Sequence, residues 1–449
     1  MKTLLAITTL VLVLSSSAAA GSEPSTTRVS VSSAGAQGDR DSFAVGLSGD
    51  ARFVLVNSLA TNLVPGDTND RWDVFVYDRS TAAMQRVSVT ASGDQARPGS
   101  DPFGGSLAGG LSANGRYVAF RSDAPNLVAH DTNRTWDIFV YDRAHHHVTR
   151  VSVSGKGRQA NGPSGDPAIS ANGRYVAFYS AATNLVTGDT NGFADVFVRD
   201  LRKHRTLRVS VTSRGRQAGC NAGGCESTEP ALSASGRYVA FESSATNLVA
   251  GDTNRLADVF VRDLRTGRTQ RVSVSSSGRQ AGGDRTNNGS NAPVISANGR
   301  YVAFHSYASN LVAGDTNRLP DIFVRDRKTR KTIRVSVSSS GRQADQENLG
   351  SAAISADGRY VAFTSLATNL VAGDLNDITD VFVRDLRTGT TTLASLGAAG
   401  NQGDDASAAG GMVFSSDDRY LAFSSWAANL VPGDTNDKPD AFVRELRGQ

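Results

Sequence analysis

Acidic and amide side chains recur at fixed spacing along this chain, in the pattern D-x-N-x-x-x-D. Carboxylate and amide oxygens are the ligands that calcium prefers, and D-x-[DN] opens many calcium loops. The same side chains also bond nearby backbone amides and shape polar loops without a metal. Both interpretations stay open at this point. The copies are Asp67, Asn69 and Asp73; Asp131, Asn133 and Asp137; Asp189, Asn191 and Asp195; Asp252, Asn254 and Asp258; Asp315, Asn317 and Asp321; Asp374, Asn376 and Asp380; and Asp434, Asn436 and Asp440.

The fifth residue of each copy weakens the calcium interpretation. A calcium loop normally has an oxygen donor at this position, followed by glycine. Here only Thr135 carries a side-chain oxygen that could bind a cation. We therefore favour a structural role for the loops and expect no required cofactor, with calcium as the alternative. The other fifth residues are Arg71, Phe193, Leu256, Leu319, Ile378 and Lys438.

A second set of polar residues lies at one variable position in an otherwise nearly constant segment, Tyr-Val-Ala-Phe-x-Ser. Different polar side chains at one equivalent position favour an asymmetric ligand site. Arg121 and Glu242 bring both charges to it, and His305 is a potential proton carrier. The competing interpretation is that these side chains fill gaps between repeated units. The ligand-binding candidates are Asn57, Arg121, Tyr179, Glu242, His305, Thr364 and Ser424.

The only two cysteines, Cys220 and Cys225, predict a local disulfide. Two thiols without a neighbouring histidine are too few for an ordinary metal site. Gly223 and Gly224 make so tight a closure sterically feasible. So short a loop adds only about 2 kcal/mol in the chain-entropy model, so the bond would stiffen one loop.

These positions belong to a repeat of about 61 residues that occurs seven times. Each unit predicts four strands, which in one copy cover residues 293–296, 301–306, 322–325 and 334–338. The middle two are nearly continuously apolar, as in buried strands, and the last alternates like an edge strand. An Asn-Gly hairpin signal links the first two strands, and a tight polar turn links the last two.

Four antiparallel strands repeated seven times predict an all-β, seven-bladed β-propeller. The last copy stops after its third strand, whereas residues 28–32 precede the first copy. The N-terminal strand is therefore expected to complete the last blade and close the ring. The long connections between units should share one face, here called the long-loop face, and the tight turns the opposite, short-turn face. A ligand is expected on the long-loop face, near which the variable position lies.

Residues 355–365, S-A-D-G-R-Y-V-A-F-T-S, followed by D-V-F-V-R-D at 380–385, resemble the WD-like propeller repeat of the TolB type. The resemblance covers all seven copies and implies the fold rather than a function. Members of that family include envelope scaffolds, propellers fused to peptidases, and polysaccharide lyases. TolB itself has six blades and an additional α/β domain, so this chain is not expected to be TolB. The chain has no G-x-S-x-G segment, which disfavours a fused serine peptidase.

The N-terminus predicts export, with a signal peptide over residues 1–20 and the propeller over residues 21–449. Lys2, an apolar run over residues 4–14 and small residues at 17–20 follow the order of a cleavable signal. We expect a secreted or periplasmic monomer without a membrane-spanning segment. The formal charge is only +4 and the basic residues form no long run, so no nucleic-acid partner is expected.

These features favour a non-enzymatic binding or scaffold protein that uses its long-loop face for a protein or glycan ligand. No catalytic residue is assigned. One alternative is a glycan lyase or hydrolase with its active site at the top of the channel. Another is a calcium-stabilised extracellular structural protein. A deep pocket with clustered groups of shifted pKa would favour the enzyme.

Overall fold

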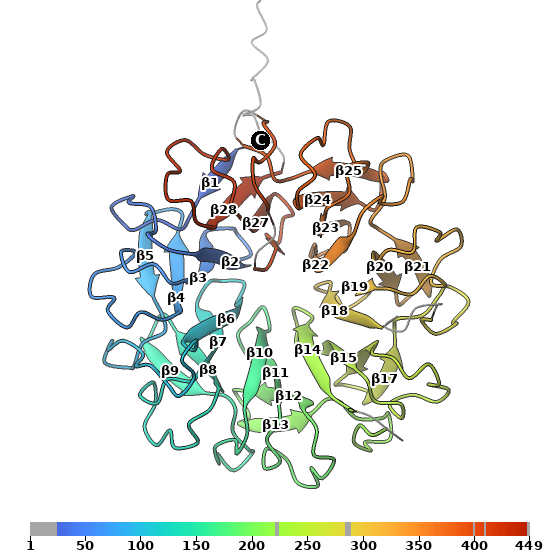
Figure 1. Cartoon of the computed structure of the whole chain (residues 1–449). Coiled ribbons are helices and arrows are strands. Elements are labelled where there is room, and N and C mark those ends of the chain that lie inside the picture. Colours follow the sequence, from blue (N-terminus) through green and yellow to red (C-terminus); the bar gives the residue numbers. More distant parts are fainter. Residues whose placement is uncertain (1–24, 221–223, 283–288, 398–399, 408–409, 447–449) are drawn as a thin grey trace, which may run out of the picture.

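A computed structural model describes residues 25–220, 224–282, 289–397, 400–407 and 410–446. These residues form seven four-stranded antiparallel sheets around a central axis (Figure 1). The predicted propeller is thereby confirmed. Within the described ranges, no helix is long and apolar enough to cross a membrane. The expected signal peptide lies outside the described residues.

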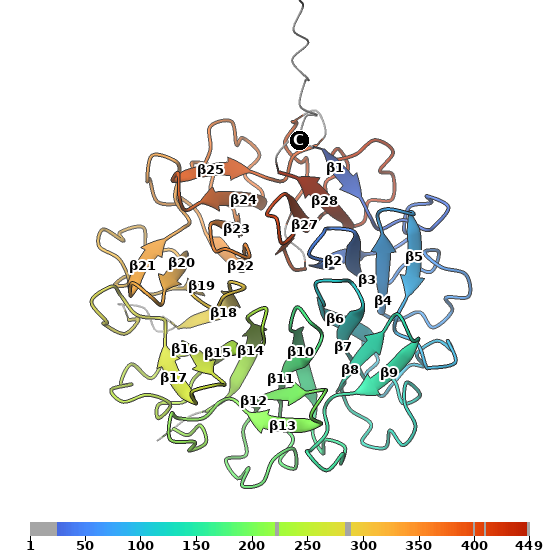
Figure 2. The same ribbon diagram turned by 180° about the vertical axis from the view of Figure 1, so that it is seen from behind.

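In blades 1–6 the strands run outward from the channel in chain order, whereas the outermost strand of blade 7 is β1 (Figure 2). Blade 1 contains β2 (Ser42–Leu47), β3 (Phe53–Ser58), β4 (Asp73–Asp78) and β5 (Ala83–Arg86). Blade 2 contains β6 (Ser106–Leu111), β7 (Tyr117–Ser122), β8 (Asp137–Asp142) and β9 (His147–Arg150). Blade 3 contains β10 (Ser164–Ile169), β11 (Tyr175–Ser180), β12 (Asp195–Asp200) and β13 (Arg205–Arg208).

The remaining blades follow the same plan. Blade 4 contains β14 (Ser227–Leu232), β15 (Tyr238–Ser243), β16 (Asp258–Asp263) and β17 (Arg268–Arg271). Blade 5 contains β18 (Ser290–Ile295), β19 (Tyr301–Ser306), β20 (Asp321–Asp326) and β21 (Lys331–Arg334). Blade 6 contains β22 (Asn348–Ile354), β23 (Tyr360–Ser365), β24 (Asp380–Asp385) and β25 (Thr390–Leu393). Blade 7 contains β26 (Val413–Phe414), β27 (Tyr420–Ser425), β28 (Asp440–Glu445) and β1 (Thr26–Arg28).

The hydrophobic core lies between neighbouring blades. In blade 5, Phe304 of β19 and Phe323 of β20 stack with their ring centroids 5.9 Å apart, and both are fully buried. They pack against Val259 and Val261 of blade 4. Each blade therefore buries its apolar faces only when its neighbours are in place.

The tight turn between the first two strands also fits one blade to the next. Gly299 has a φ of +72°, which the turn requires and which L residues rarely adopt. A Cβ at this position would lie 2.1 Å from the Tyr238 ring of blade 4. Glycine is therefore needed both for the turn and for the close approach of the preceding blade.

The fourth strand lies earlier in each repeat than the sequence predicts. In blade 5 we expected residues 334–338, but β21 ends at Arg334. Val335 donates its backbone N–H to Ile322, and Val337 then bridges to Gln343 in a turn. Both valines are buried, at 0% and 7% exposure. The alternation of apolar and polar residues over 334–338 therefore reflects burial of the valines rather than a continued strand.

The N-terminal segment closes the ring. Thr26 pairs with Arg444, and Arg28 pairs with Phe442, in the register of β1 with β28. The closing strand is thus confirmed, although it covers residues 26–28 and not the expected 28–32, for the same reason as in the other blades. Val29 still donates its backbone N–H to Ala441 at 2.8 Å.

Candidate functional site

The seven variable residues lie beside the long-loop end of the second strand in each blade, but they do not form one ring of equivalent groups. The Asn57 Oδ1 atom accepts a hydrogen bond of 2.8 Å from the backbone N–H of Ala108 in blade 2. The Ser424 hydroxyl oxygen accepts one of 2.9 Å from Ala44 in blade 1. Both side chains therefore connect adjacent blades, as the gap-filling interpretation expects.

His305 and Thr364 are also buried rather than open to the channel. The Nδ1 atom of His305 lies 2.9 Å from the Asn291 Oδ1 atom, and its ring meets Tyr307 edge-on. Burial lowers the pKa of His305 to about 4, so the imidazole is neutral at neutral pH. A buried imidazole that stays neutral is poorly suited to the proton transfer that the sequence suggested.

The remaining three candidates, Arg121, Tyr179 and Glu242, belong to blades 2, 3 and 4 and form one charged sector. The Arg121 Nη1 atom lies 3.8 Å from the Asp166 Oδ1 atom, and the guanidinium covers the Trp136 ring at 4.9 Å. Burial, followed by the nearby Asp166 charge, raises the pKa of Tyr179. The sector thus combines an arginine, a phenol and carboxylates from adjacent blades.

Two carboxylates reach the channel because the innermost strands of blades 3 and 4 are bulged. The register shifts between Gly165 and Ala168 in β10, and between Thr228 and Ala231 in β14. Asp166 lies inside the first bulge and has a φ of 46°. Glu229 lies inside the second bulge and has a φ of 51°. The innermost strands of blades 1, 2, 5 and 6 are also bulged, and Ala292 has a φ of 49° at the equivalent position of blade 5, so the bulge belongs to the repeat. A bulge of this kind re-aims a side chain, and only in blades 3 and 4 is that side chain a carboxylate.

Glu242 and Glu229 bring two interacting carboxyl groups to this sector. The Glu229 Oε2 atom accepts a hydrogen bond of 2.6 Å from the backbone N–H of Ala292 in blade 5. Burial, the charge of Glu229 and a hydrogen bond with it raise the pKa of Glu242 to about 8, with Glu226 adding to the effect. Glu242 is therefore protonated at neutral pH and can donate a hydrogen bond.

The channel opens beside this sector. Innermost strands of all seven blades line a central cavity of about 750 Å³, which includes Asp166 and Glu229. A second cavity of about 380 Å³ is lined by Asn57, Arg121, Asp166 and Pro230. Because Asp166 and Pro230 line both, the two cavities adjoin at the charged sector. We call the charged sector and the aromatic residues described next the channel mouth.

Aromatic side chains occupy the other part of the mouth, on blades 7 and 1. Phe43 of β2 stacks on Trp72 with centroids 5.5 Å apart and meets Trp426 edge-on at 6.3 Å. Trp426 directly follows β27 and remains 39% exposed. The mouth is therefore amphipathic, with charged groups on blades 2–4 and aromatic rings on blades 7 and 1.

The D-x-N loops hold an arginine between their aspartates. In blade 4 the Arg271 Nη1 atom lies 2.9 Å from the Asp252 Oδ1 atom and 3.0 Å from the Asp258 Oδ2 atom. Asn254 donates to Asp258 at 3.0 Å, and the Ser273 hydroxyl donates to its other oxygen. Burial, followed by the Asp258 charge, raises the pKa of Asp252 to about 6.

Six blades share this arginine, and blade 6 has Leu393 at the equivalent position. There the Gln402 Nε2 atom donates to Asp374 at 2.7 Å and to Asp380 at 2.8 Å. Within the described parts of the chain, no three His, Cys, Asp or Glu side chains are grouped to hold a metal ion. The guanidinium occupies the position that a cation would take, which favours the structural interpretation of the loops.

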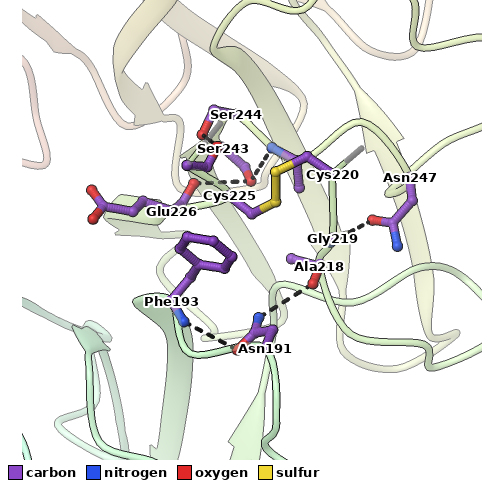
Figure 3. Close-up of a disulfide and its surroundings, with 12 residues drawn as sticks. Asn191, Phe193, Ala218, Gly219, Cys220, Cys225, Glu226, Ser243, Ser244 and Asn247 are labelled. Carbon is purple, nitrogen blue, oxygen red and sulfur yellow. Dashed lines mark hydrogen bonds between the residues drawn. A yellow bond between two sulfur atoms is a disulfide. The ribbon is translucent and has the colours of Figure 1, made fainter. Parts of the chain in front are cut away.

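The predicted disulfide is present in the long loop that precedes blade 4 (Figure 3). Cys220 and Cys225 have their Cα atoms 5.8 Å apart. Cys225 is buried among apolar side chains that include Phe193. Glu226 directly follows the bond, so the disulfide stiffens the loop that brings this carboxylate to the mouth.

Comparison with known proteins extends the fold but not the function. No family model and no curated protein matches the sequence. An oligogalacturonate lyase in complex with manganese is 12% identical, with a TM-score of 0.55, and the match covers 96% of this chain and 94% of that one. The propeller domain of the Trilobed protease from Pyrococcus furiosus is 9% identical, with a TM-score of 0.51 over 92% and 95% of the two chains.

TolB from Acinetobacter baumannii is also similar in structure, at 15% identity and a TM-score of 0.38 over 89% of this chain and 81% of that one. At such low identity the lyase and protease matches show the fold alone, so the class is a β-propeller distantly similar to those two propellers. The protease propeller has an open velcro topology, whereas in this chain β1 joins β28.

Sequence reasoning missed several residues of the mouth. Asp166 and Glu229 occupy bulges, which no hydrophobic period marks. Variation at an equivalent repeat position, the signal that identified Arg121, would also have identified Trp72 and Phe43. Trp72 directly precedes the third strand of its blade, and Phe43 is the second residue of the first strand; both positions vary between copies.

Proposed function

We propose that this protein is a non-enzymatic binding protein that holds a glycan at the channel mouth. The observation that carries the proposal is the convergence of variable repeat positions into a charged sector beside an aromatic one. Arg121 and Asp166 offer donors and acceptors for hydroxyl groups, and Phe43 and Trp426 offer rings for the apolar faces of sugars. Pockets of this composition fix a ligand by few polar contacts on an apolar surface.

The pairing of Glu229 with Glu242 supports binding over hydrolysis. Retaining glycosidases hold two carboxyl groups about 5–5.5 Å apart, and inverting ones hold them further apart to admit water. Glu229 and Glu242 interact closely enough to raise the pKa of Glu242, which leaves little room between them for the water of an inverting enzyme. The held proton of Glu242 nevertheless makes a glycan hydrolase or lyase the second candidate, because a neutral carboxyl group can act as a general acid.

The test begins with a glycan array probed with the exported protein, followed by calorimetry on the best ligand. We expect Arg121→Ala and Glu229→Gln each to weaken binding about tenfold or more, since a hydrogen bond to a charged group is worth roughly 1.5–3 kcal/mol. Asp357→Asn is the matched control, because it lies on the short-turn face and asparagine occupies the equivalent position at Asn298.

Two outcomes would overturn the proposal. Unchanged affinity in both mouth variants would place the ligand elsewhere on the molecule. Release of shortened or unsaturated sugars by the wild type, abolished in Glu242→Gln, would replace binding with catalysis as the function.

A further inference from the structure

Exposed cations gather on the short-turn face of three neighbouring blades. The turns from β12 to β13, β16 to β17 and β20 to β21 contain no acidic residue. Blades 3, 4 and 5 are adjacent in the ring, so these turns form a continuous curved row (Figure 1). We call the row the basic arc; its exposed side chains are Arg202, Lys203, Arg205, Arg265, Arg268, Lys328, Arg330 and Lys331.

The nearest aspartates do not neutralise this arc. In blade 4, Asp263 accepts hydrogen bonds of 2.9 and 2.6 Å from Arg237. In blade 5, Asp326 accepts equivalent bonds from Arg300. Each strand-end aspartate is thus already paired with an arginine outside the arc, and the arc keeps its own positive charge.

The charge at a second position of the repeat also differs between blades 3–5 and blades 1, 6 and 7. The turns between the first two strands have the neutral residues Asn172, Ser235 and Asn298 on blades 3–5. Blades 1, 6 and 7 have exposed aspartates at the equivalent positions, Asp50, Asp357 and Asp417. The short-turn face is therefore strongly basic on blades 3–5, whereas on blades 1 and 6 Asp50 and Asp357 offset the turn arginines Arg79 and Arg387.

The long loops follow this division. One position has Arg255 on blade 4 and Arg318 on blade 5, but Asp377 on blade 6 and Asp437 on blade 7. All four side chains are exposed. On blades 4 and 5 the charge at this long-loop position thus has the same sign as the basic arc, and on blades 6 and 7 it has the opposite sign.

We propose that the basic arc binds a linear acidic polysaccharide. A curved row of cations follows a chain-like polyanion, which gains affinity by releasing its counterions. A flat anionic membrane would also contact the exposed aspartates on other blades of this face, which would repel it. The large apolar side chains that are exposed in the described residues lie toward the long-loop end and offer no insertion here. Because the N-terminus predicts export, polysaccharide is favoured over nucleic acid.

The experiment compares two variants with the same loss of charge. The arc variant combines Lys203→Thr, Arg205→Thr, Arg268→Thr and Lys331→Thr, and blade 6 already has Thr390 where three of these residues lie. The control variant removes four exposed arginines from the long-loop face by substitution with asparagine, the residue that blade 6 has there. The control positions are Arg158, Arg216, Arg279 and Arg342.

Binding to polygalacturonate and heparin is measured at 50 and 200 mM NaCl, with neutral dextran as the blank. The arc variant should bind at least about tenfold more weakly at 50 mM, and the control variant should stay within about threefold of the wild type. The arc variant should bind the glycan-array ligand of the channel mouth like the wild type, which separates this site from the channel mouth.

Three results would overturn the proposal. Equal losses in the arc and control variants would mean that net charge alone drives binding. Binding to phosphatidylglycerol vesicles that exceeds binding to the polysaccharides would identify a membrane as the partner. No measurable binding of the wild type at 50 mM NaCl would leave the arc without a polyanionic ligand.

Discussion

The arginine inside the D-x-N loops can be tested by Arg271→Leu, the replacement that blade 6 already contains at Leu393. In the wild type, the Arg271 Nη1 atom lies within 3.0 Å of both Asp252 and Asp258. The three side chains are 9%, 3% and 0% exposed, so none of the charges is returned to water when the guanidinium is removed.

The expected cost follows from this burial. Removing one partner of a buried ion pair costs about 3–5 kcal/mol. Gln280 can turn toward the carboxylates as Gln402 does in blade 6, which offsets about 1–2 kcal/mol. We therefore expect a loss of about 2–4 kcal/mol at pH 7.5. For a propeller of this size that lowers the melting temperature by about 2–4 °C.

The pH dependence distinguishes buried charge from lost packing. Without the guanidinium, one aspartate should stay protonated above pH 7.5, whereas in the wild type the pKa of Asp252 is about 6. Lowering the pH from 7.5 to 5 then stabilises the variant over the whole interval, but the wild type only below its pKa. The deficit should shrink by about 2 kcal/mol.

Thermal melts at both pH values provide the assay. Arg268→Thr is the matched control, because Arg268 lies in the same strand, β17, but is exposed. It should melt within about 1 °C of the wild type at both pH values, as expected for an exposed side chain. An Arg271→Leu deficit of the same size at pH 5 and pH 7.5 would refute the electrostatic explanation, and no deficit at all would refute the structural role.

Further predictions concern closure, pH, calcium and the disulfide. Deleting residues 21–33 should lower the melting temperature by more than about 10 °C. The deletion removes a whole edge strand together with Arg28 and Ser30, which donate hydrogen bonds to Asp440. An unchanged melting temperature would contradict ring closure. The stability of the wild type should rise as the pH falls from 7 to 5, because burial raises the pKa of Asp73 and Asp321 to about 6. It should fall again below about pH 4, because aspartates paired with arginine, such as Asp326, then gain protons. Calcium at 10 mM should leave the melting temperature unchanged within about 1 °C, whereas a rise that a chelator reverses would restore the calcium interpretation. Reducing the disulfide should cost about 2 kcal/mol or less and leave the blade fold intact by circular dichroism.

The spacing of the repeats was enough to predict the blades and the ring closure, because both depend on a pattern repeated in sequence. The disulfide was predictable because the chain has only two cysteines and they lie five residues apart. The end of the fourth strand was predicted wrongly, since Val335 and Val337 are buried in a turn as they would be in a strand. The candidate site was only partly predictable. Whether a side chain such as Asn57 contacts the next blade or faces the channel depends on interblade geometry, which a single repeat does not contain.

The basic arc illustrates a different limit. Its residues are separated by about 60 positions along the chain, so no window of sequence contains more than one turn of it. The ring places these turns side by side, and a scatter of single cations becomes a surface with one sign of charge. In a propeller, charge must therefore be compared between equivalent positions of successive repeats rather than counted along the chain.

Blade 6 links the constant and the variable positions of this fold. It lacks the loop arginine, yet Asp374 and Asp380 keep the arrangement of the other blades because Gln402 donates to both. In blade 4 the equivalent Gln280 donates instead to Thr253, and blade 6 has Leu375 where that threonine would be. The amide does not depend on loss of the threonine, because Gln95 and Gln159 donate to both aspartates of blades 1 and 2, where the threonine and the arginine are present. In blade 6 the same amide contact remains and holds the two aspartates without the guanidinium. A substitution in one blade is thus not evidence of a ligand when a neighbouring residue compensates for it within the protein. At the channel mouth, by contrast, the side chains of Asp166 and Glu229 line the central cavity.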